Sequence, residues 1–452
     1  MKKYLRFLVL ILIFTVACLL PAACSTKNTI EELPQETEEQ PENVVIEGLP
    51  QMRINLFDKK GVFALSDVTR EKYVDSTISI ENTKEENLLD TVAAKFKGRG
   101  NGSWTNDKKG YRIKFKNNET TVFGKTNKHW VLLPDDSWSE KSTMYRNYLA
   151  LNLARNVFDK IEYCTSATFI DLYVNEEYQG VYVLCEHVRV SEDRVNIDSK
   201  YGEPETGYLI EYDAYADGVE GIDFFKIDGV KYPFTVHSPD PEEYEDAGIT
   251  KEVYQEQVNH IQDYVERAYN AALSKDYDTF AALVDVDSFV DMYILHELFK
   301  NVDTGWSSFY LYKKPSGKLF AGPAWDFDLS CMDARGNNSP TGIYVADEVR
   351  TDSDFTASEL YIQLYQTPEF LQKVKERWAI LSDSISAFID EQMNEEIYEQ
   401  LKNSMGENFA RWEENLTVEE AEVRWVNNMR KTKAWFAARI AWLDYEWFVI
   451  KD

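Results

Sequence analysis

The sequence predicts an α+β fold in which a β-rich part is followed by a mainly helical part. Between residue 45 and about residue 245, short runs with an apolar residue at every second position, such as Met52–Phe57, indicate half-buried strands. From about residue 246 to residue 452, apolar residues recur with the helical period instead. Apolar residues form 44% of the chain and aromatic residues 14%, which is enough for a large core.

The β-rich part is expected to be built from short strands and one helix. Alternation predicts strands at Met52–Phe57, Ser76–Glu81, Thr91–Lys97, Tyr111–Lys116, Ala167–Val174, Gly180–Leu184 and Gly207–Tyr212. The turn Asn175–Gly180 joins two of these strands as a hairpin. The helix is expected at Glu140–Val157, with Ser139 as its N-cap.

The helical part is expected to contain a single hairpin. Periodicity predicts helices at residues 251–273, 286–300, 356–367, 369–391 and 418–446. The hairpin consists of the strands Ser307–Tyr312 and Lys318–Gly322, which the turn Lys314–Gly317 joins.

The first residues have the pattern of an export signal. A basic start is followed by the apolar run Phe7–Leu20 and by small residues before Cys24, so residues 1–23 are predicted to be a signal peptide. Cys24 and the residues before it resemble the lipobox of bacterial lipoproteins, although Pro21 stands where an aliphatic residue is usual. The resemblance implies a lipid on Cys24 and anchoring at the extracytoplasmic face of the cell membrane. A plain signal peptide cut near Ala23 and an uncleaved anchor are the alternatives.

The residues after Cys24 are predicted to be a spacer. Residues 24–44 are acidic and almost free of large apolar side chains, so they cannot offset the entropy lost on ordering. The folded domain is therefore expected to span residues 45–452.

Charge and cysteine content narrow the class of protein. The formal net charge of −29 argues against a general nucleic-acid binder, because neutralising phosphates requires clusters of Lys and Arg. Cys164 and Cys185 lie on neighbouring predicted strands, so a disulfide between them and two buried free thiols are both open.

Two stretches of the β-rich part carry residues suited to binding phosphate. Lys97–Trp104 is a strand that ends in a glycine-rich turn, and Lys108–Lys114 returns with further cations. Glycines let a ligand approach the backbone closely, and the exposed N–H groups and cationic side chains can hold phosphate. A merely flexible hairpin is the alternative.

Carboxylates at two later positions are candidates for metal binding and catalysis. Asp326 and Asp328 are two residues apart on an extended chain, so they face the same side and can share a cation such as Mg²⁺. Asp303 follows an apolar helix and precedes a strand, where a carboxylate can serve as a general base. Solvated acidic groups at element ends are the alternative for all three.

Taken together, these stretches resemble the CotH kinase-like family, which is named for a spore-coat protein kinase. The residues that carry the resemblance are Lys97–Trp104, Lys109–Lys114, Ser142–Asn147, Phe169–Asn175, Tyr178–Tyr182, Leu184–Glu186, Asn301–Asp303 and Trp325–Leu329. The resemblance implies a two-lobed atypical protein-kinase-like fold that binds ATP and Mg²⁺ (or Mn²⁺) between its lobes.

The resemblance also implies roles for individual residues. Asp326 would bind the metal, Asp328 would support it, and Asp303 would accept or orient the substrate hydroxyl. The nucleotide-binding residues would be Arg99 and the glycine turn over the phosphates, Lys109 or Lys114 at the α/β-phosphates, and Glu186 as the partner of that lysine. Arg146 and Asn147 are expected either to line the cleft or to pack the helix.

One position departs from the pattern of kinases. Ser308 stands five residues after Asp303, where kinase catalytic loops place an Asn that holds a second metal. A serine hydroxyl is a weaker ligand, which puts the second metal site in doubt.

Two functions follow from these expectations. The first is Mg–ATP-dependent phosphorylation of Ser or Thr on a surface or envelope protein, by an atypical protein kinase. The alternative is a non-catalytic surface module that binds a protein, or a cell-wall or extracellular glycan, with aromatic side chains such as Trp104, Trp138 and Trp306.

Overall fold

The computed structural model describes residues 48–134, 141–332, 337–349 and 357–448, all within the unit Ile46–Asp452. The predicted signal peptide, Cys24 and the spacer lie outside the described residues, and so do Trp138 and Ser139. Among the helices in the described ranges, none is both long and apolar enough to cross a membrane.

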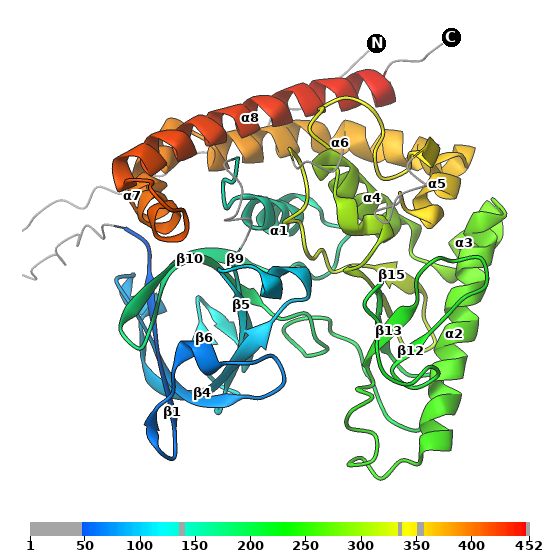
Figure 1. Cartoon of the computed structure of the whole chain (residues 1–452). Helices are drawn as coiled ribbons and strands as arrows, with labels where there is room; N and C mark the ends of the chain where they lie inside the picture. Colours follow the sequence, from blue (N-terminus) through cyan, green and yellow to red (C-terminus); the bar gives the residue numbers. More distant parts are fainter. Residues whose placement is uncertain (1–47, 135–140, 333–336, 350–356, 449–452) are drawn as a thin grey trace, which may run out of the picture. The chain divides into compact units, whose positions relative to one another are not determined.

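The first strands close into a barrel (Figure 1, blue to teal). Its strands follow one another around the barrel in the order β1 (Gln51–Asp58), β3 (Val74–Glu81), β4 (Leu89–Arg99), β5 (Gly110–Phe115), β8 (His129–Leu133), β10 (Glu177–Glu186) and β9 (Ala167–Val174). Neighbouring strands are antiparallel, except that β9 returns to β1 and pairs with it in parallel from Gln51↔Asp171 to Ile54↔Val174. This last pairing closes the sheet.

The side chains inside the barrel form a core of their own. The alternating apolar residues that predicted the strands point inward, among them Ile54, Phe96, Ile113 and Trp130, each at most 2% exposed. The predicted strands are confirmed. The resemblance implied the two lobes of a kinase, but the sheet is instead a closed barrel, because the β1–β9 pairing leaves it no free edge.

A second sheet joins segments from both halves of the chain. Its order is β12 (Phe224–Phe225), β13 (Phe234–Ser238), β11 (Tyr208–Tyr212), β14 (Phe309–Lys313) and β15 (Leu319–Ala321), and all pairs are antiparallel. The predicted strand at Gly207–Tyr212 therefore pairs with the predicted hairpin at residues 307–322.

The predicted helices are present. They are α1 (Arg146–Val157), α2 (Lys251–Leu273), α4 (Val286–Phe299), α5 (Glu359–Tyr365), α6 (Pro368–Gln392) and α8 (Val418–Phe448). The structure adds α3 (Tyr277–Leu283) and α7 (Glu395–Trp412), which periodicity did not indicate. Helix α1 begins at Arg146, later than expected, because Met144 has a positive φ of 61° that no α-helix accommodates.

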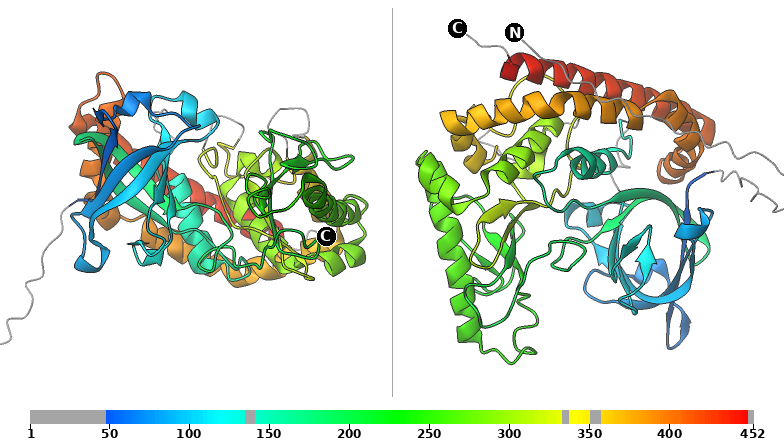
Figure 2. Two further views of the ribbon diagram at one scale, coloured as in Figure 1. Left: turned by 90° about the horizontal axis from the view of Figure 1, so that it is seen from below. Right: turned by 180° about the vertical axis from the view of Figure 1, so that it is seen from behind.

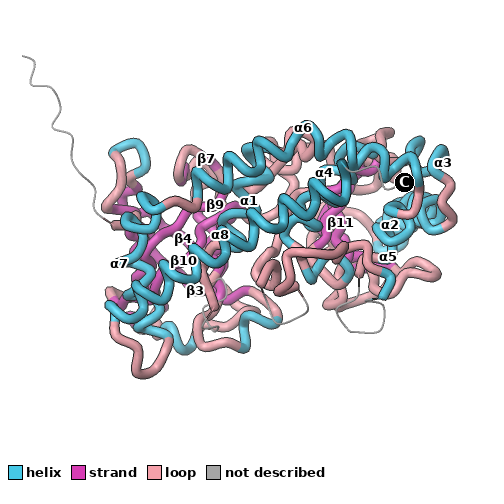
Figure 3. Tube along the Cα trace, turned by 90° about the horizontal axis from the view of Figure 1, so that it is seen from above, coloured by secondary structure: helices cyan, strands magenta, loops and turns pink. Residues whose placement is uncertain are grey.

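The long helices α6 and α8 lie side by side over the rest of the helical part (Figures 2 and 3). Helix α7 packs against α8 and also on the barrel at β10. There Asn408 accepts hydrogen bonds from Val181 N at 3.0 Å and from Lys108 Nζ at 2.8 Å, and Trp412 Nε1 donates to Gln179 O at 3.1 Å. The C-terminal helices thus hold the barrel against the helical part.

The cysteines in the described part, Cys164, Cys185 and Cys331, are buried free thiols. Burial raises the pKa of Cys164 to about 12, so this thiol stays protonated at neutral pH. Cys164 and Cys185 are therefore free thiols in the structure and do not form the disulfide that the sequence left open.

Gly180 allows α7 to approach the barrel, and its replacement tests this contact. It has a φ of +96°, and a Cβ at this position would lie 2.5 Å from Asn408 Oδ1. Gly124 is the matched control, because it has a φ of +73° but open space around it. We expect Gly180→Ala to lower the free energy of unfolding by about 3 kcal/mol and Gly124→Ala by about 1 kcal/mol, measured by urea denaturation. Equal losses would mean that the contact contributes nothing.

Candidate active site

The three aspartates singled out in the sequence come together at one place. Asp303 lies on the 3-10 helix Val302–Gly305 after α4, and Asp326 and Asp328 lie on the segment after β15. One oxygen of each carboxylate lies within 4.8 Å of the others. Asp303 is buried and the other two are half-buried.

Asn301 holds the two segments that carry these aspartates. Its Nδ2 donates to Asp326 O at 2.9 Å, and its Oδ1 accepts from Asp303 N at 3.2 Å. The same amide lies 3.2 Å from Nδ1 of His296, which Thr304 Oγ1 also contacts at 3.0 Å. Burial lowers the pKa of His296 to about 3, so the ring is neutral and its Nδ1 can accept these bonds.

Helix α1 holds the aspartate segment from the other side. Asn147 Oδ1 accepts from Phe327 N at 2.7 Å, and Arg146 Nη1 donates to Asp328 O at 3.0 Å. Asn147 also lines the cavity described below. Arg146 and Asn147 were expected either to line the cleft or to pack the helix. Asn147 does both, and Arg146 fixes the backbone next to the site.

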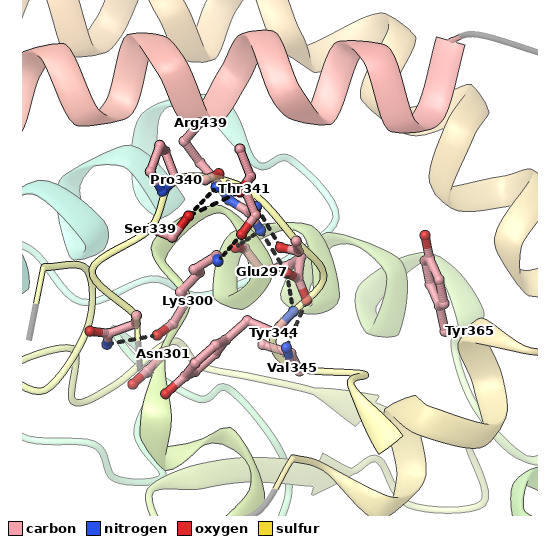
Figure 4. A network of polar contacts seen from close by, with 12 residues as sticks. Glu297, Lys300, Asn301, Ser339, Pro340, Thr341, Tyr344, Val345, Tyr365 and Arg439 are labelled. Atoms are coloured by element: carbon pink, nitrogen blue, oxygen red, sulfur yellow. Dashed lines mark hydrogen bonds and ion pairs between the residues drawn. The ribbon is translucent and has the colours of Figure 1, made fainter. Parts of the chain in front are cut away.

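A buried ion pair lies behind the site (Figure 4). Glu297 on α4 and Arg439 on α8 are both fully buried, and Arg439 Nη2 donates to the Glu297 carboxylate at 2.6 Å. The same carboxylate accepts from the backbone N–H groups of Tyr344 and Val345 at 2.7 and 2.8 Å. Lys300, which ends α4, donates to Thr341 O. No local pattern in the sequence indicates this network, because its members are far apart along the chain.

A cavity of about 590 Å³ opens above the aspartates. Apart from Leu133 and Pro134, its residues form three groups: the glycine-rich turn from Arg99 to Asn106, the aspartate segments with Asn147, and a wall from the second sheet and the residues next to its strands. That wall is formed by Glu211, Asp213, Tyr215, Trp306, Ser307, Ser308 and Tyr310. Gly100 has a φ of +100°, which lets the turn fold toward the cavity.

The other predicted nucleotide-binding residues lie outside the lining of this cavity. Lys109 Nζ donates to Trp104 O and Asn106 O, at 2.9 Å each, and so supports the glycine-rich turn. Lys114 lies on β5 opposite His129. Glu186 Oε2 accepts from Ser166 N at 2.6 Å and from its hydroxyl at 2.7 Å, and its Oε1 has no hydrogen-bond partner among the described residues. The structure thus brings Arg99 to the aspartates, and it pairs Glu186 with Ser166 rather than with a lysine.

Glu211 and Asp213 are two further acidic groups of the site that were not predicted. Glu211 accepts from Ser308 N at 3.1 Å and lies 2.7 Å from His237 Nε2. Asp213 accepts from Ser307 Oγ at 2.9 Å, and its pKa is raised by burial and by Glu211. They are two residues apart, as Asp326 and Asp328 are, and this repeated spacing was available in the sequence. The expected extended chain is absent at Asp326, whose φ is 58°.

The electrostatics of the site favour the binding of a cation. Burial raises the pKa of Asp326, while the Arg99 guanidinium lowers it and Glu211 raises it. Ser308 Oγ lies 3.4 Å from Asp326 Oδ2. Clustered carboxylate oxygens are the ligands that Mg²⁺ and Mn²⁺ prefer, so the residues present fit such an ion.

Comparison with known families decides the relationship. A family model described as CotH kinase protein matches residues 96–443. The chain belongs to the CotH kinase protein family. A search of curated proteins found no match. The part shared with the CotH family contains Arg99 and all three aspartates, whereas β1 and β3 of the barrel precede it.

The aspartate cluster predicts metal binding with a defined pH dependence. A carboxyl whose pKa is raised on folding destabilises the folded protein as the pH rises through that pKa, and a bound cation opposes this loss. We therefore expect Mn²⁺ to raise the melting temperature more at neutral than at acidic pH. Asp326→Asn should abolish the shift, and Asp240→Asn, which lies outside the cavity, should retain it. An unchanged shift in Asp326→Asn would exclude this site.

Proposed function

We propose that this CotH family protein is an atypical protein kinase that transfers phosphate from ATP to Ser or Thr hydroxyls of a surface or envelope protein. The observation that supports the proposal is the cluster of Asp303, Asp326 and Asp328 in a cavity that is also lined by a glycine-rich turn with Arg99. Phosphoryl transfer depends mainly on positioning and charge neutralisation, which such a cavity can provide.

Each residue would have a distinct role. Asp326 and Asp328 would hold Mg²⁺ or Mn²⁺, which neutralises phosphate charge when bound. Asp303 would orient the acceptor hydroxyl and take up its proton, because a carboxylate is the group that the cavity offers next to the metal ligands. Arg99 and the backbone N–H groups of Gly100–Asn106 would hold phosphate oxygens. Asn301 would keep Asp303 in register with Asp326 through its two backbone contacts.

A second candidate function is a binding module without catalysis. Ser308 favours this second function, because its single hydroxyl stands where a kinase has an amide ligand for a second metal. Glu211, which accepts a hydrogen bond from Ser308 N, adds a carboxylate beside that position. Trp306 lines the cavity and contacts Tyr215 and Tyr232, where it could stack on a sugar. Trp104 instead covers Gly98 and packs on Tyr111.

Nucleotide binding and transfer separate the two functions. The soluble protein from residue 45 onward should gain thermal stability with Mg–ATP, and Asp326→Ala should lose this response. Asp303→Asn should keep the thermal response and lower the rate of transfer from radiolabelled ATP to protein acceptors or to itself by roughly a hundredfold to ten-thousandfold. No stabilisation by any nucleotide with Mg²⁺ or Mn²⁺ would exclude the kinase, and full activity of Asp303→Asn would exclude its role as base.

We also propose that the protein is exported and held at the membrane by a lipid on Cys24, with residues 24–44 as a flexible spacer. The pattern of residues 1–24 supports this proposal. In cells that make bacterial lipoproteins, the protein should partition into the detergent phase of Triton X-114, and Cys24→Ser should move it to the aqueous phase. Cys18→Ser is the control and should leave the partition unchanged. Equal partition of the Cys24→Ser variant and the unmodified chain would exclude the lipid.

A further inference from the structure

Cations gather on the outer face of the barrel beside the active-site cavity. Lys97 on β4 lies directly opposite Arg112 on β5, and Lys114 follows Arg112 on the same face of β5. Burial lowers the pKa of Lys114, and the nearby charges of Lys128 and Arg189 lower it further. We call these half-buried residues, Lys97, Arg112, Lys114, Lys128 and Arg189, the cation strip.

The cation strip has few partners in a chain whose net charge is −29. Among the described residues, Arg112 has no hydrogen bond and no ion pair, although its Nε is buried. Next to it, His129 is 6% exposed and its Nδ1 has no hydrogen-bond partner in the described part of the chain. Burial and the cations, Arg189 foremost, lower the pKa of His129 to about 2. Cations gathered on one face of a strongly acidic chain make this surface attractive to an anionic ligand.

The cation strip lies beyond the cavity. Arg99 lines the cavity, whereas none of the five residues of the strip does. Since residues two apart on a strand are separated by about 6.7 Å, the strip leads from Arg99 to Lys97 and onward across β5. A nucleotide that fills the cavity therefore leaves the strip available to another ligand.

An acidic segment of the chain itself already approaches the strip. Asp240 lies 3.8 Å from Arg189. Burial and Arg112 lower the pKa of Lys97, and Glu242 raises it. Burial also lowers the pKa of Lys114, and Glu243 raises it. In the described structure Asp240 pairs with Arg189, whereas Glu242 and Glu243 form no close ion pair with the lysines of the strip. The strip therefore attracts carboxylates and is neutralised by them only in part.

We propose that the cation strip binds an extended acidic segment of a polypeptide partner. A peptide with a carboxylate at every second residue presents one charge about every 6.7 Å, which matches the spacing of Arg112 and Lys114 along β5. If the protein is the kinase proposed above, this partner is the acceptor protein, and the strip leads its chain into the cavity. The binding itself does not depend on catalysis.

Fluorescence anisotropy with a labelled peptide in which Glu alternates with Ser tests the proposal. We expect binding that weakens with added salt, and no binding of the matched peptide with Gln in place of Glu. The strip variant Lys97→Gln/Arg112→Gln/Lys128→Gln should bind about tenfold more weakly, because each half-exposed ion pair contributes modestly. The matched control Lys59→Gln/Lys60→Gln/Lys84→Gln removes exposed lysines elsewhere and should bind normally.

A second variant gives a change of opposite sign. Asp240→Asn/Glu242→Gln/Glu243→Gln removes the competing carboxylates and should strengthen binding of the Glu peptide. Saturating Mg–ATP should leave the peptide affinity unchanged. Displacement of the peptide by Mg–ATP would assign the strip to the nucleotide and overturn the proposal, and so would equal binding by the strip variant and its control. If the protein binds the peptide but gains no thermal stability with Mg–ATP, the kinase is contradicted and the strip remains a binding site.

Discussion

The site depends on the buried pair of Glu297 and Arg439. Desolvating two charges is costly, and here the cost is offset because the carboxylate also accepts two backbone N–H groups and the guanidinium donates to the carbonyls of Pro340 and Gly342. The pair fixes the end of α4 to the segment before residue 345 and to α8. Since Asn301 follows that end directly, the position of Asp303 and Asp326 is set from the far side of the helical part.

Charge is the second constraint. The cavity gathers Glu211, Asp213 and the three aspartates around one arginine, and it is attractive to a cation until one binds. The outer face of the barrel has the opposite character, because β4 and β5 turn their apolar residues inward and their cations outward. One strand pair thus separates an apolar barrel core from a cationic surface, and the chain passes from that surface to an acidic cavity within a few residues.

Local patterns in the sequence indicated individual elements well. The strand β9 and the helix α2 have the predicted bounds, the latter because Thr250 caps its first turn with Oγ1 accepting from Val253 N. Closure of the barrel could not be predicted, since β1 and β9 are far apart in sequence and no local pattern encodes their pairing. The spacing of Asp326 and Asp328 indicated a shared cation, and that of Glu211 and Asp213 carried the same signal. The contacts of Lys109 and Glu186 depend on Trp104 and Ser166, whose proximity only the fold determines.

The place of Arg439 in the chain has a consequence for biosynthesis. Every residue around the cavity is translated before it, and the bonds that hold the end of α4 form only after it has emerged. A chain cut ahead of α8 keeps all three aspartates and Asn301 but loses the bonds that Arg439 makes to the end of α4. The bonds of Arg439 to Glu297 therefore form only once translation has passed residue 439, and fragments from premature termination or from a protease lack them.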